Sequence, residues 1–258
     1  MKILVVGDPH GIKIKKVPKN LDLILVTGDV GKADLARKRF FENQERKKQG
    51  LPELEENADL IKQVHGQIHN STLDVLSHYS RFAPVYTLAG NVGIPAKNSS
   101  DEKKYGIKLP STLAQVEEMK NVHVVKNRLR VLDGLRVGFL DNFADVCWHK
   151  EFGVDVSPTA KKETPKAKRI LRRFRKDLDI LLCHQPPYGI LDKVNFPGAP
   201  KHWKGKHAGS KVVLDYIKKY SPRYVFCGHI HEAKGKKKAG KTQVYNVGAN
   251  GDYIVLDI

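Results

Sequence analysis

The feature that most constrains this chain is a series of short aliphatic segments that each end at a glycine. The first three are KILVVG at 2–7, LDLILVTG at 21–28 and PVYTLAG at 84–90. Segments of this kind, rich in β-branched residues, are typical of buried strands that run into a loop. Stretches with helical spacing of apolar residues separate them or follow later, including 52–79 and 209–220. The alternation predicts an α/β fold.

The second half of the chain is richer in strands. Strands are expected at 121–125, 128–134, 135–141, 178–187 and 223–231, followed by two final strands joined at 248–251. Asp133 and Gly134 are typical hairpin-turn residues. We expect 145–165 to be irregular before a basic helix, and 190–208 to be a functional loop rather than an idle one. No linker separates two cores, so residues 1–258 are predicted to form a single domain.

Charge is the strongest global feature, because the formal net charge is +18. Residues 161–176 carry nine basic side chains and one acidic one, and residues 234–241 carry five lysines and no acid. Such a surface attracts anions, and both nucleic acid and a small phosphate ester are candidates. A lysine-rich composition suited to a hot environment is the alternative, but it explains the excess over acids poorly.

Nothing in the sequence indicates a membrane or an oxidising compartment. No apolar run reaches the length of a membrane span, and the start, MKILVVGDPHG, is too short and too quickly polar for a signal peptide. The cysteines, Cys147, Cys183 and Cys227, are too few for a disulfide framework. We therefore expect a reduced, cytoplasmic protein with no membrane partner.

Polar residues of metal-ligand type stand at the ends of five predicted strands. They are Asp8, His10, Asp29, Asn91, His184, His229 and His231. Ligands of open α/β sheets bind outside the carboxyl ends of the strands. A lone Asp or Asn beside glycine is usually a turn residue, and a lone His is usually a satisfied polar group, but five such strand ends together favour a metal site. Two carboxylates, several imidazoles and an amide suit two transition-metal ions better than Ca or Mg.

The blocks "GDPHG", "TGDVG", "AGNVG", "CHQPP" and "GHIH" resemble those of the calcineurin-like metallophosphoesterases, in the family's order. The resemblance implies a four-layer α-β-β-α sandwich with a dinuclear metal site at the strand C-terminal ends. It implies that Asp8, His10 and His231 hold one metal, that Asn91, His184 and His229 hold the other, and that Asp29 bridges them. The implied cofactors are two divalent transition-metal ions, with manganese expected ahead of Fe, Zn, Ni or Co.

The implied activity is hydrolysis of phosphate mono- or diesters by a hydroxide that bridges the two metals. The family pattern places a histidine, taken as the general acid, where this chain has Val92. Either a good leaving group makes the acid unnecessary, or another residue replaces it. His207 is the predicted catalytic replacement, with an exposed loop histidine as the alternative, and Ser210 at a helix N-terminus is a predicted substrate-binding residue.

Three functions stay open on the sequence. The first is a phosphatase or phosphodiesterase acting on a phosphate ester, including a nucleotide. The second is a nuclease or nucleic-acid-binding protein that uses the basic runs. The third is a metal-binding scaffold without activity, which the intact ligand set disfavours. Side chains of the long loop could line the substrate cleft or simply pack within the loop, and they are Tyr188, Asn195, Phe196, Trp203 and Lys206.

Overall fold

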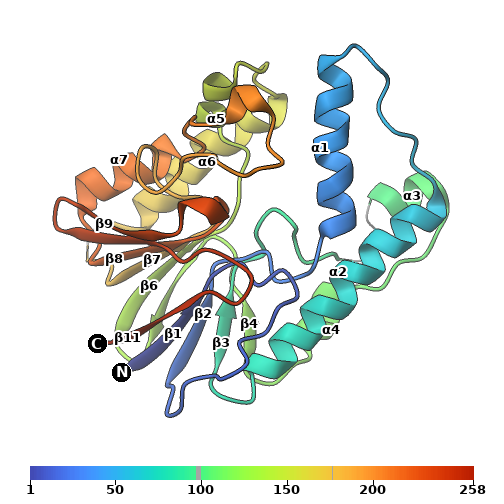
Figure 1. The fold of residues 1–258 in the computed structure, drawn as a ribbon. Coiled ribbons are helices and arrows are strands. Elements are labelled where there is room, and N and C mark those ends of the chain that lie inside the picture. The colour runs from blue at the N-terminus through green and yellow to red at the C-terminus, as the bar shows by residue number, and fades with distance from the viewer. Residues whose placement is uncertain (97–99, 176) are drawn as a thin grey trace.

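The computed structural model describes residues 1–96, 100–175 and 177–258, and these residues form two β-sheets (Figure 1). The first sheet has the strand order β11 (Tyr253–Asp257), β1 (Lys2–Val6), β2 (Leu23–Val26), β3 (Val85–Thr87) and β4 (Val122–Val124). The second has the order β5 (Arg128–Leu132), β6 (Leu135–Leu140), β7 (Ile180–Cys183), β8 (Tyr224–Cys227), β10 (Thr242–Asn246) and β9 (Gly235–Ala239).

The strands that precede the predicted ligands run parallel within each sheet. In the first sheet β1, β2 and β3 are parallel neighbours, with Val5 opposite Leu25 in register. In the second sheet β6, β7 and β8 are parallel, with Leu182 opposite Phe226. Parallel strands carry their C-terminal ends to one edge of a sheet, so the loops that follow them meet there.

The described part of the chain contains seven α-helices. They are α1 (Asp34–Lys48), α2 (Ala58–Tyr79), α3 (Ser100–Tyr105), α4 (Thr112–Glu117), α5 (Val146–Phe152), α6 (Pro158–Phe174) and α7 (Lys211–Tyr220). In Figure 1, α2 and α4 flank the first sheet, and α6 and α7 flank the second. Within the described residues, none of these helices is both long enough and apolar enough to span a bilayer.

Alternating side chains of β1 show how the four layers arise. Ile3 and Val5 pack between the two sheets, against strand residues such as Phe226. Leu4 and Val6 point to the other face and pack against α2. Because successive side chains of a strand face opposite sides, a fully apolar strand of this kind must be covered on both faces. The predicted α-β-β-α arrangement is therefore confirmed by the structure.

Some predicted boundaries were wrong. Helix α2 begins at Ala58 rather than near residue 52, because Asn57 caps it by accepting a hydrogen bond from the backbone N–H of Leu60. The segment 145–165, expected to be irregular, contains α5 and the first turns of α6, each capped by a side chain, Asp145 and Ser157 respectively. Strand β9 was not predicted, since its lysines hide the usual strand pattern.

The described residues of the two basic runs lie at opposite ends of the second sheet. Helix α6 packs on β5 and β6 at one end of that sheet, whereas β9 is the strand at its other edge. Lysines on an exposed edge strand hinder pairing with other chains, which is a structural reason for Lys236, Lys237 and Lys238. Lys176, the last residue of the first run, lies outside the described residues.

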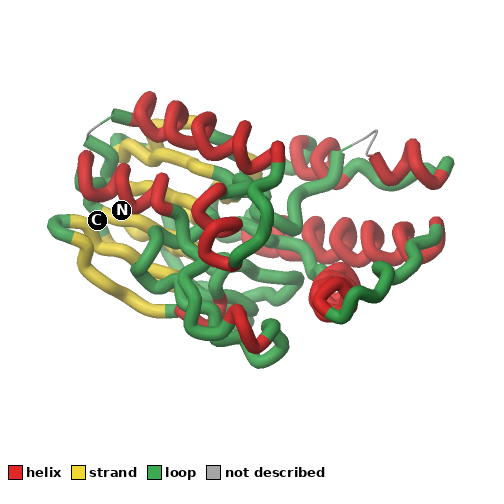
Figure 2. The backbone as a smooth tube through the Cα atoms, turned by 90° about the horizontal axis from the view of Figure 1, so that it is seen from above, coloured by secondary structure: helices red, strands yellow, loops and turns green. Residues whose placement is uncertain are grey.

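Helix α1 stands away from both sheets. It is upright in Figure 1 and is seen end-on in Figure 2, clear of the yellow strands. None of its residues is buried, and its sequence, DLARKRFFENQERKK, is dominated by charges. The helix is nevertheless tied to the segment that follows it, since Arg39 and Arg46 donate to backbone carbonyls between Pro52 and Glu55. This position leaves α1 beside the strand ends rather than in the core.

Candidate metal centre

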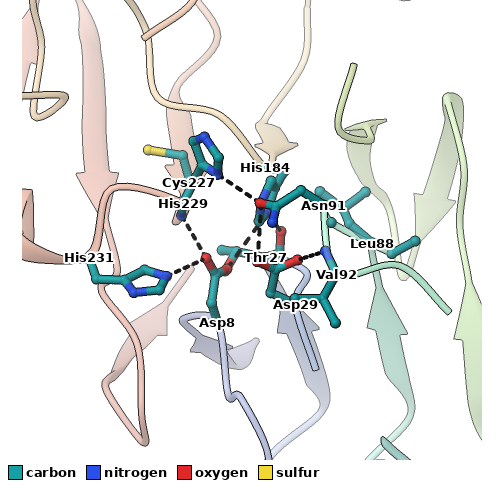
Figure 3. A network of polar contacts seen from close by, with 12 residues as sticks. Asp8, Thr27, Asp29, Leu88, Asn91, Val92, His184, Cys227, His229 and His231 are labelled. Atoms are coloured by element: carbon teal, nitrogen blue, oxygen red, sulfur yellow. Dashed lines mark hydrogen bonds and ion pairs between the residues drawn. The ribbon is translucent and has the colours of Figure 1, made fainter. Parts of the chain in front are cut away.

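Six of the seven predicted ligands are labelled at the strand ends in Figure 3, and His10 lies beside Asp8 and His231. Asp8 and His10 follow β1, Asp29 follows β2, and Asn91 follows β3. His184 follows β7, and His229 and His231 follow β8. Two groups have donor atoms within 4.8 Å of one another, one formed by Asp8, His10 and His231, and the other by Asp8, Asp29 and His184.

The first group has the spacing of donors that share one ion. The Nε2 atoms of His10 and His231 lie 3.2 Å apart, and Nε2 of His231 lies 3.3 Å from Oδ2 of Asp8. Ligands held at about 2.0–2.2 Å from one transition-metal ion are separated by about 3 Å, so these three side chains fit a metal without rearrangement.

The second group is completed by an amide. Oδ1 of Asn91 lies 2.8 Å from Nε2 of His184 and 2.9 Å from Nδ1 of His229. Asp29, a member of the second group, also lies near the first, because its Oδ2 atom is 3.7 Å from Nε2 of His184 and 3.9 Å from Nε2 of His10. One carboxylate oxygen thus faces donors of both groups, as a bridging ligand must.

Further hydrogen bonds fix the orientation of these side chains. Thr27 donates from its hydroxyl to Oδ1 of Asp8 at 2.6 Å, and the backbone N–H of His229 donates to Oδ2 at 2.6 Å. Nδ1 of His184 lies 3.0 Å from the carbonyl oxygen of Thr27, to which it donates, which leaves Nε2 to face the site. The backbone N–H of Val92 donates to Oδ1 of Asp29 at 2.7 Å.

Backbone conformation also marks this region. His10, Asp29 and His229 have φ values of 46°, 43° and 65°, in the left-handed region that non-glycine residues rarely adopt. Such strain persists only where the surroundings hold it, and it is concentrated at functional sites. The backbone of Gly228 lies so close to Asp8 that a Cβ at this position would overlap the carboxylate, so no larger residue fits there.

Burial and mutual charge set the protonation of the centre. Burial first, aided by Arg37, lowers the pKa of His10 to about 3, and burial with neighbouring His184 lowers the pKa of His229 to about 3. Burial, reinforced by Asp8, raises the pKa of Asp29 to about 6. Two imidazoles are therefore neutral at physiological pH, which is the form that binds metals.

The two remaining buried groups form the charged part of the cluster. Burial opposes ionisation of Asp8, but His184, His231 and His10 outweigh it and hold its pKa well below its usual range. Burial also opposes protonation of His184, yet Asp29 and Asp8 raise its pKa. In this cluster the negative carboxylates and positive imidazoles offset one another's charge. Binding of a metal cation would therefore displace protons from it.

A cavity of about 590 Å³ opens beside the centre. Its lining includes Asp29, Asn91, His229 and His231, together with residues of α1, α5 and the loop 190–208. Arg37 of α1 lines it and lies with Nη2 3.0 Å from Nε2 of His10, to which it donates. Sequence reasoning missed Arg37, because nothing in a charged helical stretch distinguishes one arginine from its neighbours.

Two predicted site residues are placed differently. His207 is not among the described residues that line the cavity; its Nδ1 lies 2.7 Å from Oδ1 of Asp192. Ser210 is 1% exposed, donates to Asp145 at 2.6 Å and caps α7 at the backbone N–H of Val213. The prediction that Ser210 binds substrate disagrees with this placement, because its hydroxyl is enclosed and fully used.

Comparison with known proteins agrees with the geometry. The family model "Metallophosphoesterase, calcineurin superfamily" matches residues 12–258, so Asp8 and His10 lie just before the match. UPF0046 protein K07C11.7 of Caenorhabditis elegans is 24% identical over 212 residues, covering 72% of this chain and 67% of that protein.

Two solved structures resemble this chain at low sequence identity, and the first of them shares its fold. One crystal structure superposes with a TM-score of 0.62 at 18% identity, over 99% of this chain and 94% of that one. The protein TT1561 of Thermus thermophilus gives a TM-score of 0.47 at 15% identity, over 99% and 93% of the two chains. On the family match, which spans nearly its whole length, the chain belongs to the calcineurin superfamily of metallophosphoesterases.

Proposed function

We propose that this protein is a metal-dependent hydrolase of phosphate mono- or diesters. The observation that carries the proposal is the position of Asp29, whose single Oδ2 atom faces the imidazoles of both groups. Asp8, His10 and His231 would hold one divalent ion, and Asn91, His184 and His229 the other. Members of this superfamily use two divalent metals, and the mixture of carboxylate, amide and imidazole donors suits manganese first, then Fe, Zn, Ni or Co.

The bound ions would supply Lewis acidity and a nucleophile derived from water at neutral pH. The chain itself positions the ester. Arg37 donates to His10 in the structure. Once the lone pair of His10 is used for a metal, the guanidinium must find another acceptor, and a phosphate oxygen at the adjoining centre provides one. A guanidinium presents paired donors that match phosphate geometry, so Arg37 is assigned to hold the substrate phosphate.

Departure of the leaving group is the step for which the family pattern has a histidine at position 92, where this chain has valine. Val92 lines the cavity but has no proton to donate. Among the described residues, His149 of α5 is the imidazole outside the seven ligands that lines the cavity, so it replaces His207 as the candidate proton donor. Its Nδ1 donates to the carbonyl oxygen of Asp145 at 3.0 Å, so the protonated ring would give up the proton on Nε2 to the leaving oxygen.

The test is hydrolysis of chromogenic mono- and diesters by metal-free protein to which Mn²⁺, Fe²⁺, Zn²⁺, Ni²⁺ or Co²⁺ is returned. We expect turnover that depends on the ion and that Asp29→Ala reduces by at least about 100-fold, because removing the shared oxygen affects both ions. Asp133→Ala, in the exposed turn between β5 and β6, is the control. Failure of every ion to support turnover, or full activity in Asp29→Ala, would refute the proposal.

Nucleic acid is the second candidate substrate, supported by the basic composition. The separation of α6 from β9 argues against one continuous basic track leading to the centre. We therefore place the small-ester activity first, with the protein acting as a cytoplasmic enzyme. An inactive scaffold comes last, since the seven donors are brought together with ligand spacing.

A further inference from the structure

The cavity beside the metal centre is unusually rich in aromatic side chains. Both tryptophans of the chain and five of its nine phenylalanines line it. The rings come from α1, from α5 and its surroundings, and from the loop 190–208, and they are Phe40, Phe41, Phe143, Trp148, Phe152, Phe196 and Trp203. Segments far apart in the sequence therefore contribute rings to one space, which is larger than a phosphate group needs.

The rings divide into a wall and a mouth. Trp148, Phe152 and Trp203 form a packed wall with centroids 4.9–5.6 Å apart. At the mouth, Phe41 of α1 stacks on Phe196 of the loop, with centroids 5.6 Å apart and planes 23° from parallel. Phe196 is 40% exposed. Together with the other rings of the lining, it adds apolar surface that a ligand in this cavity could cover.

Polar atoms interrupt the apolar lining. Gln185 and Trp203 are 8% and 7% exposed, and within the described part of the chain Oε1 of Gln185 and Nε1 of Trp203 have no hydrogen-bond partner. Both atoms are almost fully enclosed, so recognition of a ligand in this cavity depends on the aromatic faces rather than on these two atoms. Arg37 and the metal ligands lie along the same lining and would take the charged end of such a ligand.

We propose that this cavity recognises the organic part of the substrate and selects a phosphoester that carries a planar aromatic ring. The inference rests on the proposed function for the phosphate end, but ring recognition depends on different residues. Phe41 and Phe196 provide faces for stacking, and the wall of Trp148, Phe152 and Trp203 limits the depth. The aromatic group is either a nucleobase or a simple aryl ring, since both offer a flat face and a polar or polarisable edge.

Binding of phosphonates tests this without requiring turnover, because a P–C bond is not hydrolysed as an ester. The full-length protein loaded with Zn²⁺ is titrated with benzylphosphonate and with hexylphosphonate, which share a head group and have similar apolar size. Calorimetry gives each Kd, and tryptophan fluorescence reports occupancy, since both tryptophans line the cavity. We expect benzylphosphonate to bind at least about threefold tighter, the lower range of an aromatic pair beyond area burial.

Variants test which rings cause benzylphosphonate to bind more tightly than hexylphosphonate. Phe41→Ala and Phe196→Ala should each reduce the benzyl-to-hexyl ratio toward one, and Phe196→Leu should do the same while keeping apolar bulk. Phe82→Ala removes a ring that is 44% exposed outside the cavity lining and should leave the ratio unchanged. Equal or tighter binding of hexylphosphonate, or a ratio that survives both Phe41→Ala and Phe196→Ala, would overturn the inference.

A third ligand separates the two sources of the ring. A nucleoside 5′-methylenephosphonate that binds more tightly than benzylphosphonate assigns the cavity to a nucleobase, and weaker binding assigns it to a simple aryl group. Failure of the proposed function and failure of the ring recognition give different results. A protein that hydrolyses no ester can still bind benzylphosphonate more tightly than hexylphosphonate. Conversely, metal-dependent hydrolysis with no benzyl preference rejects the ring selection alone.

Discussion

Replacing Asp29 by asparagine should stabilise the metal-free protein but destabilise the protein relative to the wild type when metal is bound. The carboxylate is 2% exposed and lies near Asp8, and these surroundings raise its pKa from 3.8 to about 6. Without metal, an ionised Asp29 therefore destabilises the fold. Asp29→Asn removes the charge and retains an oxygen to accept the hydrogen bond from the backbone N–H of Val92. The metal-free variant should be more stable than the wild type at neutral pH.

The magnitude follows from the difference between the folded and unfolded pKa values of this carboxyl. Because the folded value is the higher one, the stability present below pH 3.8 is lost as the pH rises through 6. The rise to about 6 corresponds to about 3 kcal/mol at pH 8, of which about half is already lost at pH 5. The stability advantage of Asp29→Asn should thus grow by about 1.5 kcal/mol between pH 5 and pH 8.

Divalent metal should reverse this order. An ion that binds only the folded protein adds about 4.1 kcal/mol at a concentration about 1,000 times its Kd, which exceeds the variant's advantage of about 3 kcal/mol at pH 8, and the variant lacks the charged oxygen that both ions would share. Urea denaturation followed by circular dichroism, with EDTA or with Mn²⁺, measures both effects, and Asp133→Asn in an exposed turn is the control. A metal-free Asp29→Asn that is less stable than the wild type at pH 8, or whose advantage does not vary with pH, would refute the reasoning.

Further outcomes are expected from the same geometry. Metal binding should release more protons at pH 5 than at pH 8, because the pKa of Asp29 is about 6, as calorimetry in buffers of different ionisation enthalpy can measure. Gly228→Ala should abolish metal binding in calorimetry, since its Cβ would overlap Asp8. Val92→His should raise turnover of alkyl esters by about tenfold or more and leave aryl esters nearly unchanged in steady-state assays. His149→Ala should lower alkyl-ester turnover, and His207→Ala should not. Single-stranded RNA should bind weakly and be released by about 0.2 M salt in filter-binding assays, because the two basic runs are separated.

The clustering of the seven predicted ligands could be predicted from the sequence because each of them follows the end of a strand. Each ligand stands within a few residues of a strand whose apolar pattern is unambiguous, such as Asp8 after β1 and His184 after β7. Parallel pairing then brings those ends to one edge without any further information. The order of the four layers was implied by the resemblance to the calcineurin-like metallophosphoesterases, and it agrees with strands that are apolar on both faces and so require cover on both sides.

The cavity could not be predicted in the same way. Its lining combines α1, which has almost no apolar face, with α5, which lies in a segment that reads as irregular. Phe196 and Trp203 were recognised as possible cleft residues from the long loop, and both line the cavity, but Tyr188, Asn195 and Lys206 are not among its described lining residues. Contacts such as that between Phe41 and Phe196 depend on tertiary packing across distant segments, for which local spacing carries no signal.

Position 92 shows how a site can lose one function and keep another. The backbone N–H of residue 92 donates to Oδ1 of Asp29, and it does so whichever side chain is attached. The carboxylate that faces both ligand groups is therefore held as firmly with valine as with histidine, while the capacity to donate a proton disappears. Under the proposed function, we expect a change at this position to alter which leaving groups can depart without altering how metals would be held. The aromatic cavity beside it then gains importance, because an aryl leaving group departs with little need for a proton.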